Sequence, residues 1–143
     1  VLTAYSCLAI IELLTNIEPR TVQENGGEIV TYLWGYNSQY PIAVVRNSNF
    51  AKIAAALGGE SQVNSMEQAI QPTRTSTELY NILSKIQGGL VSIYSFNPYI
   101  GIIEMIAANG EKTTYSYDDF CRLESIKDHD GIVSRAYKYN YRQ

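Results

Sequence analysis

The feature that most constrains the fold is a strand-and-turn unit, which is clearest in Thr113–Gly131. Alternating side chains at 113–117 predict an extended strand, which Asp118-Asp119 interrupts. Alternation resumes at 122–127 and again at 132–139, on either side of an Asp-His-Asp-Gly turn. Aspartate and glycine both accept the left-handed backbone that tight turns require. We therefore expect an antiparallel meander of three strands.

This unit recurs along the chain at a nearly constant interval. The aromatic pairs Tyr94-Ser95-Phe96, Tyr115-Ser116-Tyr117 and Tyr137-Lys138-Tyr139 follow one another at almost equal spacing. Gly110 and Gly131 are separated by the same interval. One aromatic pair and one turn glycine per period are typical of a β repeat whose neighbours stack to bury a shared face.

The same residues carry a family resemblance. Tyr115-Ser116-Tyr117-Asp118, followed by Arg122-Leu123 and Gly131, resembles the tyrosine–aspartate (YD) repeat of the Rhs family of large bacterial surface and secreted proteins. Residues 32–43, which read YLWGYNSQYPIA, and residues 94–110 are similar to segments that accompany such repeats in Bacteroidetes-type members. The resemblance implies that the chain is a segment of a larger protein.

The resemblance also implies roles for single residues. Arg122 is expected to pair with Asp118 of its own unit or of a neighbour, and Asp118 to cap the turn. The glycine that usually precedes the Arg-Leu pair is Cys121 here, so the turn must close differently or carry strain. The implied structural core of the repeat is Tyr115, Tyr117, Asp118, Arg122, Leu123 and Gly131. Trp34, Gly35, Tyr36 and Pro41 are expected to fix an earlier turn.

Towards the N-terminus, the pattern is less regular. Val1–Leu14 is apolar but too short to span a bilayer, and we interpret it as a core segment, a strand by the resemblance or else a helix. The segment 16–27 is expected to be a connection, with Asn25-Gly26 as a hairpin signal. A strand at 28–34 and an extended segment at 39–46 follow, joined by a turn.

Residues 47–89 are expected to form a helical insertion between two β segments. Asn47-Ser48-Asn49 offers an N-cap to a short helix that Gly58-Gly59 ends. A second helix is expected within 60–71, with Val63, Met66 and Ile70 on one face. A third begins at the capping box Thr75–Glu78 and ends at Gly88-Gly89, with an apolar stripe of Leu79, Ile82, Leu83 and Ile86. The flanking strands should close one sheet beneath these helices.

The net charge and the few Cys and His residues argue against several functional classes. A net charge of −3 and a pI near 5.1 leave no electrostatic footprint for nucleic acid. Cys7 and Cys121 are expected to be free, packed thiols without the surroundings of a nucleophile. His129 has no partner histidine, so a solvent-exposed turn residue is favoured over a triad or a zinc site. We expect no cofactor, no metal and no enzymatic activity.

Two clusters are candidates for ligand sites. The aspartates at 118, 119, 128 and 130 could attract calcium, but they lack EF-hand spacing and are better explained as turn caps. Tyr32, Trp34, Tyr36 and Tyr40 resemble aromatic clusters that stack on sugars, although such stripes on strands more often pack against each other.

The sequence as a whole predicts one domain, 1–143, mainly β, in which an antiparallel YD-repeat meander carries a helical insertion. The resemblance implies an extracellular or cell-surface structural segment, part of a shell or scaffold for a polymorphic toxin or for surface display. Its expected partners are neighbouring repeats of the same longer chain, with toxin cargo or surface glycans beyond them. The alternative is a carbohydrate-binding or adhesin module that uses exposed Trp and Tyr residues.

Overall fold

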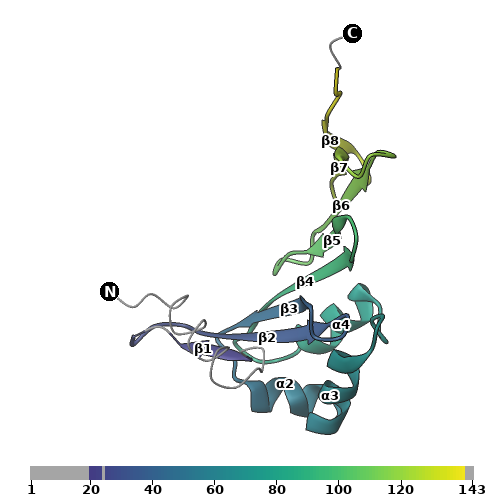
Figure 1. Ribbon diagram of the computed structural model, residues 1–143. Coiled ribbons are helices and arrows are strands. Elements are labelled where there is room, and N and C mark those ends of the chain that lie inside the picture. Colours follow the sequence, from purple (N-terminus) through teal and green to yellow (C-terminus); the bar gives the residue numbers. More distant parts are fainter. Residues whose placement is uncertain (1–19, 24, 141–143) are drawn as a thin grey trace.

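The computed structural model describes residues 20–23 and 25–140, and these form one antiparallel sheet with helices on one face of its first half (Figure 1). The eight strands lie in sequence order across the sheet. They are β1 (Thr21–Gln23), β2 (Ile29–Gly35), β3 (Tyr40–Arg46), β4 (Leu90–Asn97), β5 (Gly101–Ile106), β6 (Lys112–Tyr117), β7 (Leu123–Lys127) and β8 (Val133–Ala136). The three described helices are α2 (Phe50–Leu57), α3 (Glu60–Gln68) and α4 (Ser76–Leu83). This arrangement confirms the predicted mainly β meander with a small helical insertion.

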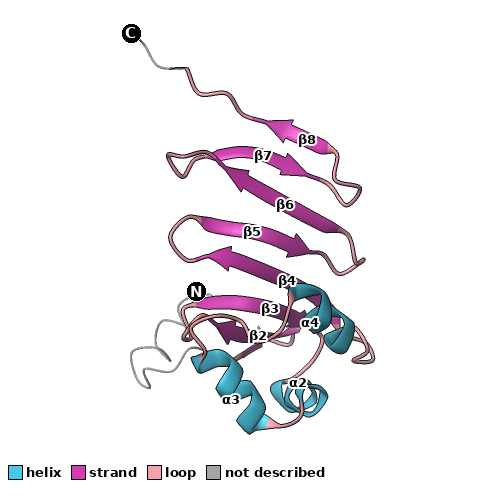
Figure 2. Ribbon diagram, turned by 90° about the vertical axis from the view of Figure 1, so that its right-hand side faces the viewer, coloured by secondary structure: helices cyan, strands magenta, loops and turns pink. Residues whose placement is uncertain are grey.

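The strands on either side of the insertion pair directly, as predicted. Ala43 of β3 lies opposite Ile93 of β4, and Val45 lies opposite Val91. The insertion therefore leaves the sheet and returns to it without interrupting the strand order (Figure 2).

Local capping explains where α2 and α4 begin. The Asn49 side chain accepts a hydrogen bond from the Lys52 amide at the start of α2, and Gly58 ends the helix in the left-handed region at φ 99°. At α4, the hydroxyl of Thr75 and the carboxylate of Glu78 each accept the other residue's backbone N–H. Both features confirm the predicted caps.

Two helix ends differ from the prediction. α3 stops at Gln68, because Ser38 and Asn37 donate their backbone N–H groups to the carbonyls of Glu67 and Ala69. Ile70 consequently lies beyond the helix and is 79% exposed, so its predicted place on the packed face was wrong. α4 ends at Leu83, ahead of the predicted glycine pair, and the chain continues to β4 through turns.

The buried core lies where the helices cover the sheet. Its fully buried side chains include Leu33, Val45 and Ile93 from the strands, and Ile53, Leu57, Val63 and Leu83 from the helices. The last buried residue along the described chain is Ile106 at the end of β5. β6, β7 and β8 therefore form a single-layer arm, residues 112–136, that rises from a packed base (Figure 1).

The two faces of the sheet differ in polarity as it leaves the base. Strand register aligns Ser95, Glu104, Thr114 and Lys127 in one row, on the face that carries the buried Ile93 and Ile106. Ser76 of α4 donates a hydrogen bond to Glu104, and Lys112 forms a 3.2 Å ion pair with it, which marks this row as the helix side. The opposite face carries Tyr94 beside Met105 and Tyr115 beside Ile126. The arm is therefore amphipathic.

The ends of the sheet differ from the prediction. The segment 16–27 is not wholly a connection, because Thr21–Gln23 forms β1, a short edge strand of β-branched character that the sequence reading missed. β8 is shorter than the predicted strand at 132–139. Val1–Leu14, which includes Cys7, lies outside the described residues, so the interpretation of this segment stays a prediction. None of the described helices has the length and apolarity needed to cross a membrane.

Candidate functional site

Three of the predicted repeat residues, Asp118, Arg122 and Gly131, lie in hairpin turns that share one backbone geometry, whereas Tyr115, Tyr117 and Leu123 lie in β6 and β7. In each turn, the first residue donates its N–H to the carbonyl of the fifth and accepts from the N–H of the fourth, at N–O distances of 2.8–3.0 Å. The turns are 107–111, 118–122 and 128–132. Because consecutive turns lie at opposite ends of the strands, the repeat period corresponds to two strands and a return to the same sheet margin.

The fourth residue of each turn has a left-handed backbone. Gly110 and Gly131 have φ values of 86° and 79°, and Cys121 occupies the equivalent place at φ 60°. The turn at Cys121 thus closes in the usual way and places a non-glycine residue in a strained conformation. This outcome is the second of the two expected alternatives. Cys121 is a free thiol, as predicted, but it is exposed and not packed.

The aspartate that opens a turn also caps it. Oδ1 of Asp118 accepts hydrogen bonds from the N–H groups of Phe120 (2.9 Å) and Arg122 (3.0 Å). Asp128 repeats this arrangement with Asp130 (3.1 Å) and Ile132 (2.9 Å). The bond two residues on is the one that aspartate makes in such turns. The predicted capping role is therefore confirmed at Asp118.

Arg122 is held on several sides. Its Nη2 lies 2.7 Å and its Nε 2.9 Å from Oδ2 of Asp118, so the pair belongs to a single unit. The guanidinium also lies over the rings of Phe120, at 5.2 Å, and Tyr139, at 4.2 Å. The hydrogen bond from Arg122 lowers the pKa of Asp118, which keeps this carboxylate ionised.

On this margin of the sheet, which also holds the turn at 97–101, a tyrosine of the following unit binds the backbone just after the turn. The hydroxyl of Tyr117 donates to the carbonyl of Ile102 (2.6 Å), and that of Tyr139 donates to the carbonyl of Leu123 (2.8 Å). Burial and the neighbouring Tyr115 raise the pKa of Tyr117, so its hydroxyl remains a donor. The sequence reading did not find this contact, although the regular spacing of the aromatic pairs was its signal.

The opposite margin has contacts of the same kind. Nδ1 of His129 accepts the backbone N–H of Lys112 at 3.2 Å, and the hydroxyl of Tyr80 donates to the carbonyl of Ala108 at 3.0 Å. His129 is an exposed turn residue, as predicted, and it also ties its turn to the strand that follows 107–111, the previous turn on the same margin. Neighbouring units are thus linked at both margins of the sheet.

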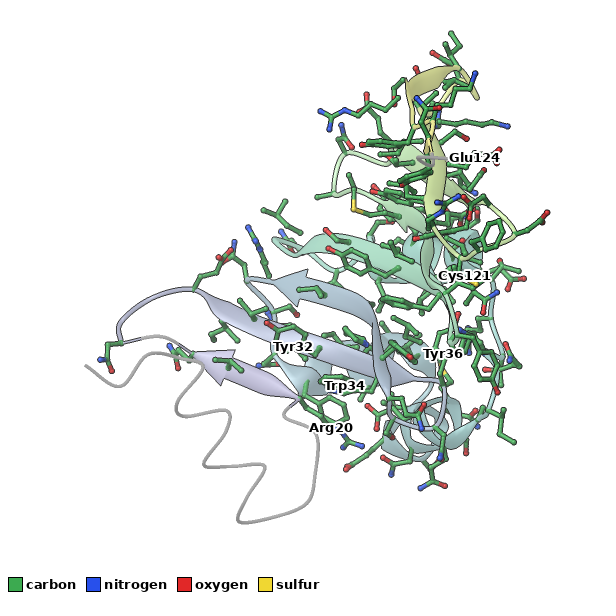
Figure 3. All side chains as sticks on the ribbon, turned by 45° about the horizontal axis from the view of Figure 1, so that its top comes forward. Arg20, Tyr32, Trp34, Tyr36, Cys121 and Glu124 are labelled. Atoms are coloured by element: carbon green, nitrogen blue, oxygen red, sulfur yellow. The ribbon has the colours of Figure 1, made fainter. Side chains whose placement is uncertain are left out.

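Ring contacts divide the predicted aromatic cluster into two groups, and Figure 3 labels three of its members, Tyr32, Trp34 and Tyr36. Tyr32 and Trp34 are half-buried neighbours on β2, with ring centroids 6.2 Å apart and planes tilted by 32°. Tyr36 is 5% exposed and packs edge-on against Tyr40, at 5.8 Å, and Phe96, at 6.1 Å. Its hydroxyl accepts the Phe96 N–H at 2.9 Å. Tyr36 and Tyr40 thus belong to the packed core or its margin.

The earlier turn has unusual backbone geometry. Tyr36, Asn37 and Ser38 all have positive φ, between 52° and 60°. Just before them, a Cβ on Gly35 would lie 2.7 Å from the Ile42 side chain, so only glycine fits there. Pro41 pairs with Trp34 beside a bulge in β3. Of the residues predicted to fix this turn, Tyr36 lies within it, and Trp34, Gly35 and Pro41 lie in the strands beside it.

An ion pair that the sequence reading missed joins β1 to the insertion. Nη2 of Arg20 lies 2.7 Å from Oε2 of Glu67 and 2.5 Å from Oδ1 of Asn64, and the guanidinium lies 4.5 Å from the centre of the Phe50 ring. Glu67 is buried, and its Oε1 has no hydrogen-bond partner. Removing Arg20 would leave a buried carboxylate uncompensated, so this contact locks the edge strand onto α3.

The acidic side chains do not gather into a metal site within the part of the chain that the structure describes. No group of three or more His, Cys, Asp or Glu side chains there lies close enough to hold an ion. Asp118 and Asp128 open turns at opposite ends of β7, so the four aspartates considered for calcium are separated. What the arrangement offers is a series of interlocked turns. Compared with family models, curated proteins and solved structures, the chain matches none of them.

Proposed function

We propose that this chain is a non-enzymatic structural segment of a secreted or cell-surface Rhs/YD-repeat protein, where it forms part of a shell or scaffold. The observation that carries the proposal is the linkage between neighbouring units. Beside two turns, a tyrosine of the next unit donates a hydrogen bond to the backbone of the strand that the turn opens: Tyr117 to Ile102, and Tyr139 to Leu123. A unit of this kind is complete only when another follows it, which is the physical logic of a repeat array.

The arm supports the same proposal. β6, β7 and β8 contain no buried residue, and one face of the arm carries half-buried apolar side chains at Tyr115 and Ile126. A single sheet layer with an open edge is only marginally stable by itself and is prone to pair with further strands. Neighbouring repeats of a longer chain would cover both the edge and the face. A toxin cargo or displayed domain would then be held by the whole assembly.

The decisive experiment measures the mass of the native polypeptide. An antibody raised against the Thr113–Gly131 segment is used to blot source cells and their medium. A band far above 16.0 kDa in the medium or at the cell surface supports the proposal. A band at 16.0 kDa confined to the cell interior contradicts it.

A second candidate function rests on one pair of rings. Tyr32 and Trp34 lie side by side on β2 and are both half-buried, which suits a small sugar-stacking platform. Because Trp34 is the only tryptophan, its fluorescence reports on this site alone. A saturable response to added glycans that Tyr32→Ala removes would favour a carbohydrate-binding module. An unchanged spectrum would remove this candidate.

A further inference from the structure

We propose that Asn25 is a site of spontaneous deamidation, and that the fold protects the second Asn-Gly pair, Asn109-Gly110, from the same reaction. Both pairs lie in hairpin turns, between β1 and β2 and between β5 and β6. They share the sequence that reacts most readily, since glycine puts no side chain in the way of the ring that must form. Their surroundings differ at each point that the chemistry depends on.

The reaction is intramolecular and needs only water. The backbone nitrogen of the glycine loses its proton and attacks Cγ of the asparagine, so that a new C–N bond forms and the side-chain amide leaves as ammonia. Water then opens the five-membered imide at either carbonyl and gives aspartate or isoaspartate. The glycine N–H must therefore be free of a hydrogen bond, and the asparagine side chain must be free to rotate.

Asn25 meets both requirements. Asn25 and Gly26 are exposed, and no hydrogen bond among the described residues engages the Asn25 side chain or the Gly26 N–H. Gly26 has φ 67°, and a Cβ built on it would meet no atom within 4 Å, so the space around the turn is open. Nothing in the described part of the hairpin holds the two reacting groups apart.

Asn109 fails both requirements. The Gly110 N–H donates to the carbonyl of Ala107 at 2.8 Å, and Oδ1 of Asn109 accepts the Glu111 N–H at 3.1 Å. The Tyr80 hydroxyl lies 3.3 Å from the place of a Cβ on Gly110, so this turn is also covered. Both the nucleophile and the carbonyl carbon are held in the unreactive arrangement.

Three other described asparagines, Asn37, Asn49 and Asn97, are blocked in other ways. The residue after Asn37 is Ser38, whose N–H donates to the Glu67 carbonyl at 2.7 Å. Asn97 precedes Pro98, which has no N–H. Asn49 uses its Oδ1 to cap α2. Of the two Asn-Gly pairs, Asn25-Gly26 is thus the one that the described structure leaves open to reaction.

The test is incubation of the folded protein at mildly alkaline pH, followed by peptide mass spectrometry in heavy-oxygen water. Each of the two hydrogen bonds that protect Asn109 should slow its reaction about five- to sixfold, so Asn25 should react roughly 30-fold faster. This ratio corresponds to a difference of about 2 kcal/mol in activation free energy. In denaturant the two sites should react at similar rates, because both are then open Asn-Gly pairs. Asn25→Gln should abolish the main product.

A second readout follows the hairpin itself. Isoaspartate adds a backbone atom to a turn whose β1 strand has only three residues, so pairing with β2 should loosen. The Tyr32 N–H, which donates to the Arg20 carbonyl at 2.7 Å, should then exchange faster in the aged protein than in the aged Asn25→Gln variant. Equal rates at the two asparagines in the folded protein, or a faster rate at Asn109, would overturn the proposal.

Discussion

Cys121 has the backbone conformation that the two equivalent turns give to glycine. A left-handed backbone costs a residue with a Cβ about 1–2 kcal/mol, whereas glycine adopts it freely but loses about 0.5–1 kcal/mol more entropy on folding. We therefore expect Cys121→Gly to stabilise the protein by roughly 0.5–1 kcal/mol, measured by denaturant unfolding.

Gly131 provides the matched control for this substitution. It has φ 79°, and a Cβ placed on it would meet nothing within 4 Å, so Gly131→Ala tests backbone strain without steric interference. We expect that variant to be less stable than the wild type. If both substitutions changed stability in the same direction, backbone strain at these turns would not be the cause.

The charge of Asp118 should contribute stability that depends on pH. Its pKa is lowered in the folded state by the hydrogen bond from Arg122, so the contribution is present above the ordinary aspartate pKa of about 3.9 and is lost as pH falls through the lower folded value. Asp118→Asn should therefore lower the melting temperature at neutral pH, and the difference from wild type should shrink in acid. Asp119→Asn, an exposed neighbour, should show little difference at either pH. A pH-independent effect of Asp118→Asn would contradict the role of the ion pair.

Residues that act within one turn were predictable from the sequence, whereas residues whose contacts come from distant segments were not. Turn glycines and capping aspartates act within a single turn, so sequence alone located Asp118 and Gly131. The ring of Tyr139 over Arg122 depends on the return of the chain in the following unit, which spacing suggested but could not place. Three consecutive positive φ values at 36–38 depend on the end of α3, to which no local pattern points.

At the scale of elements, α2 and α4 begin at predicted side-chain caps and α2 ends at the predicted Gly58, whereas α3 ends where a tertiary contact places it. The Thr75–Glu78 box was recognisable because both partners lie within one turn of helix. The end of α3 was not recognisable, because it depends on residues that are distant in the sequence. The N–H groups of Asn37 and Ser38 donate to the carbonyls of Ala69 and Glu67 there. β1 was missed since three residues carry too little pattern to distinguish a strand from a connection.

The α4 cap gives an element-scale prediction. Thr75→Ala removes the hydroxyl that accepts the Glu78 N–H, and we expect a loss of about 1 kcal/mol in the free energy of unfolding. Thr77→Ala, at an exposed position in the first turn, serves as the control and should have little effect. Because α4 covers β4 with buried Leu79 and Leu83, the loss should appear in global unfolding. An equal effect of the two substitutions would argue against the capping box.

At the scale of the whole molecule, the base and the arm differ in what holds them together. Every buried residue of the described chain lies between Thr31 and Ile106, whereas the arm at 112–136 is held by strand pairing and by contacts between turns. Amide exchange should therefore be slow in β2, β3 and β4 and become progressively faster towards β8. A variant that ends at Glu111 should still unfold cooperatively and keep the near-ultraviolet signal of Trp34 and Tyr36. Loss of that signal would mean that the arm stabilises the base. Its retention would mean that the base folds without the arm, as the concentration of buried residues in the base predicts.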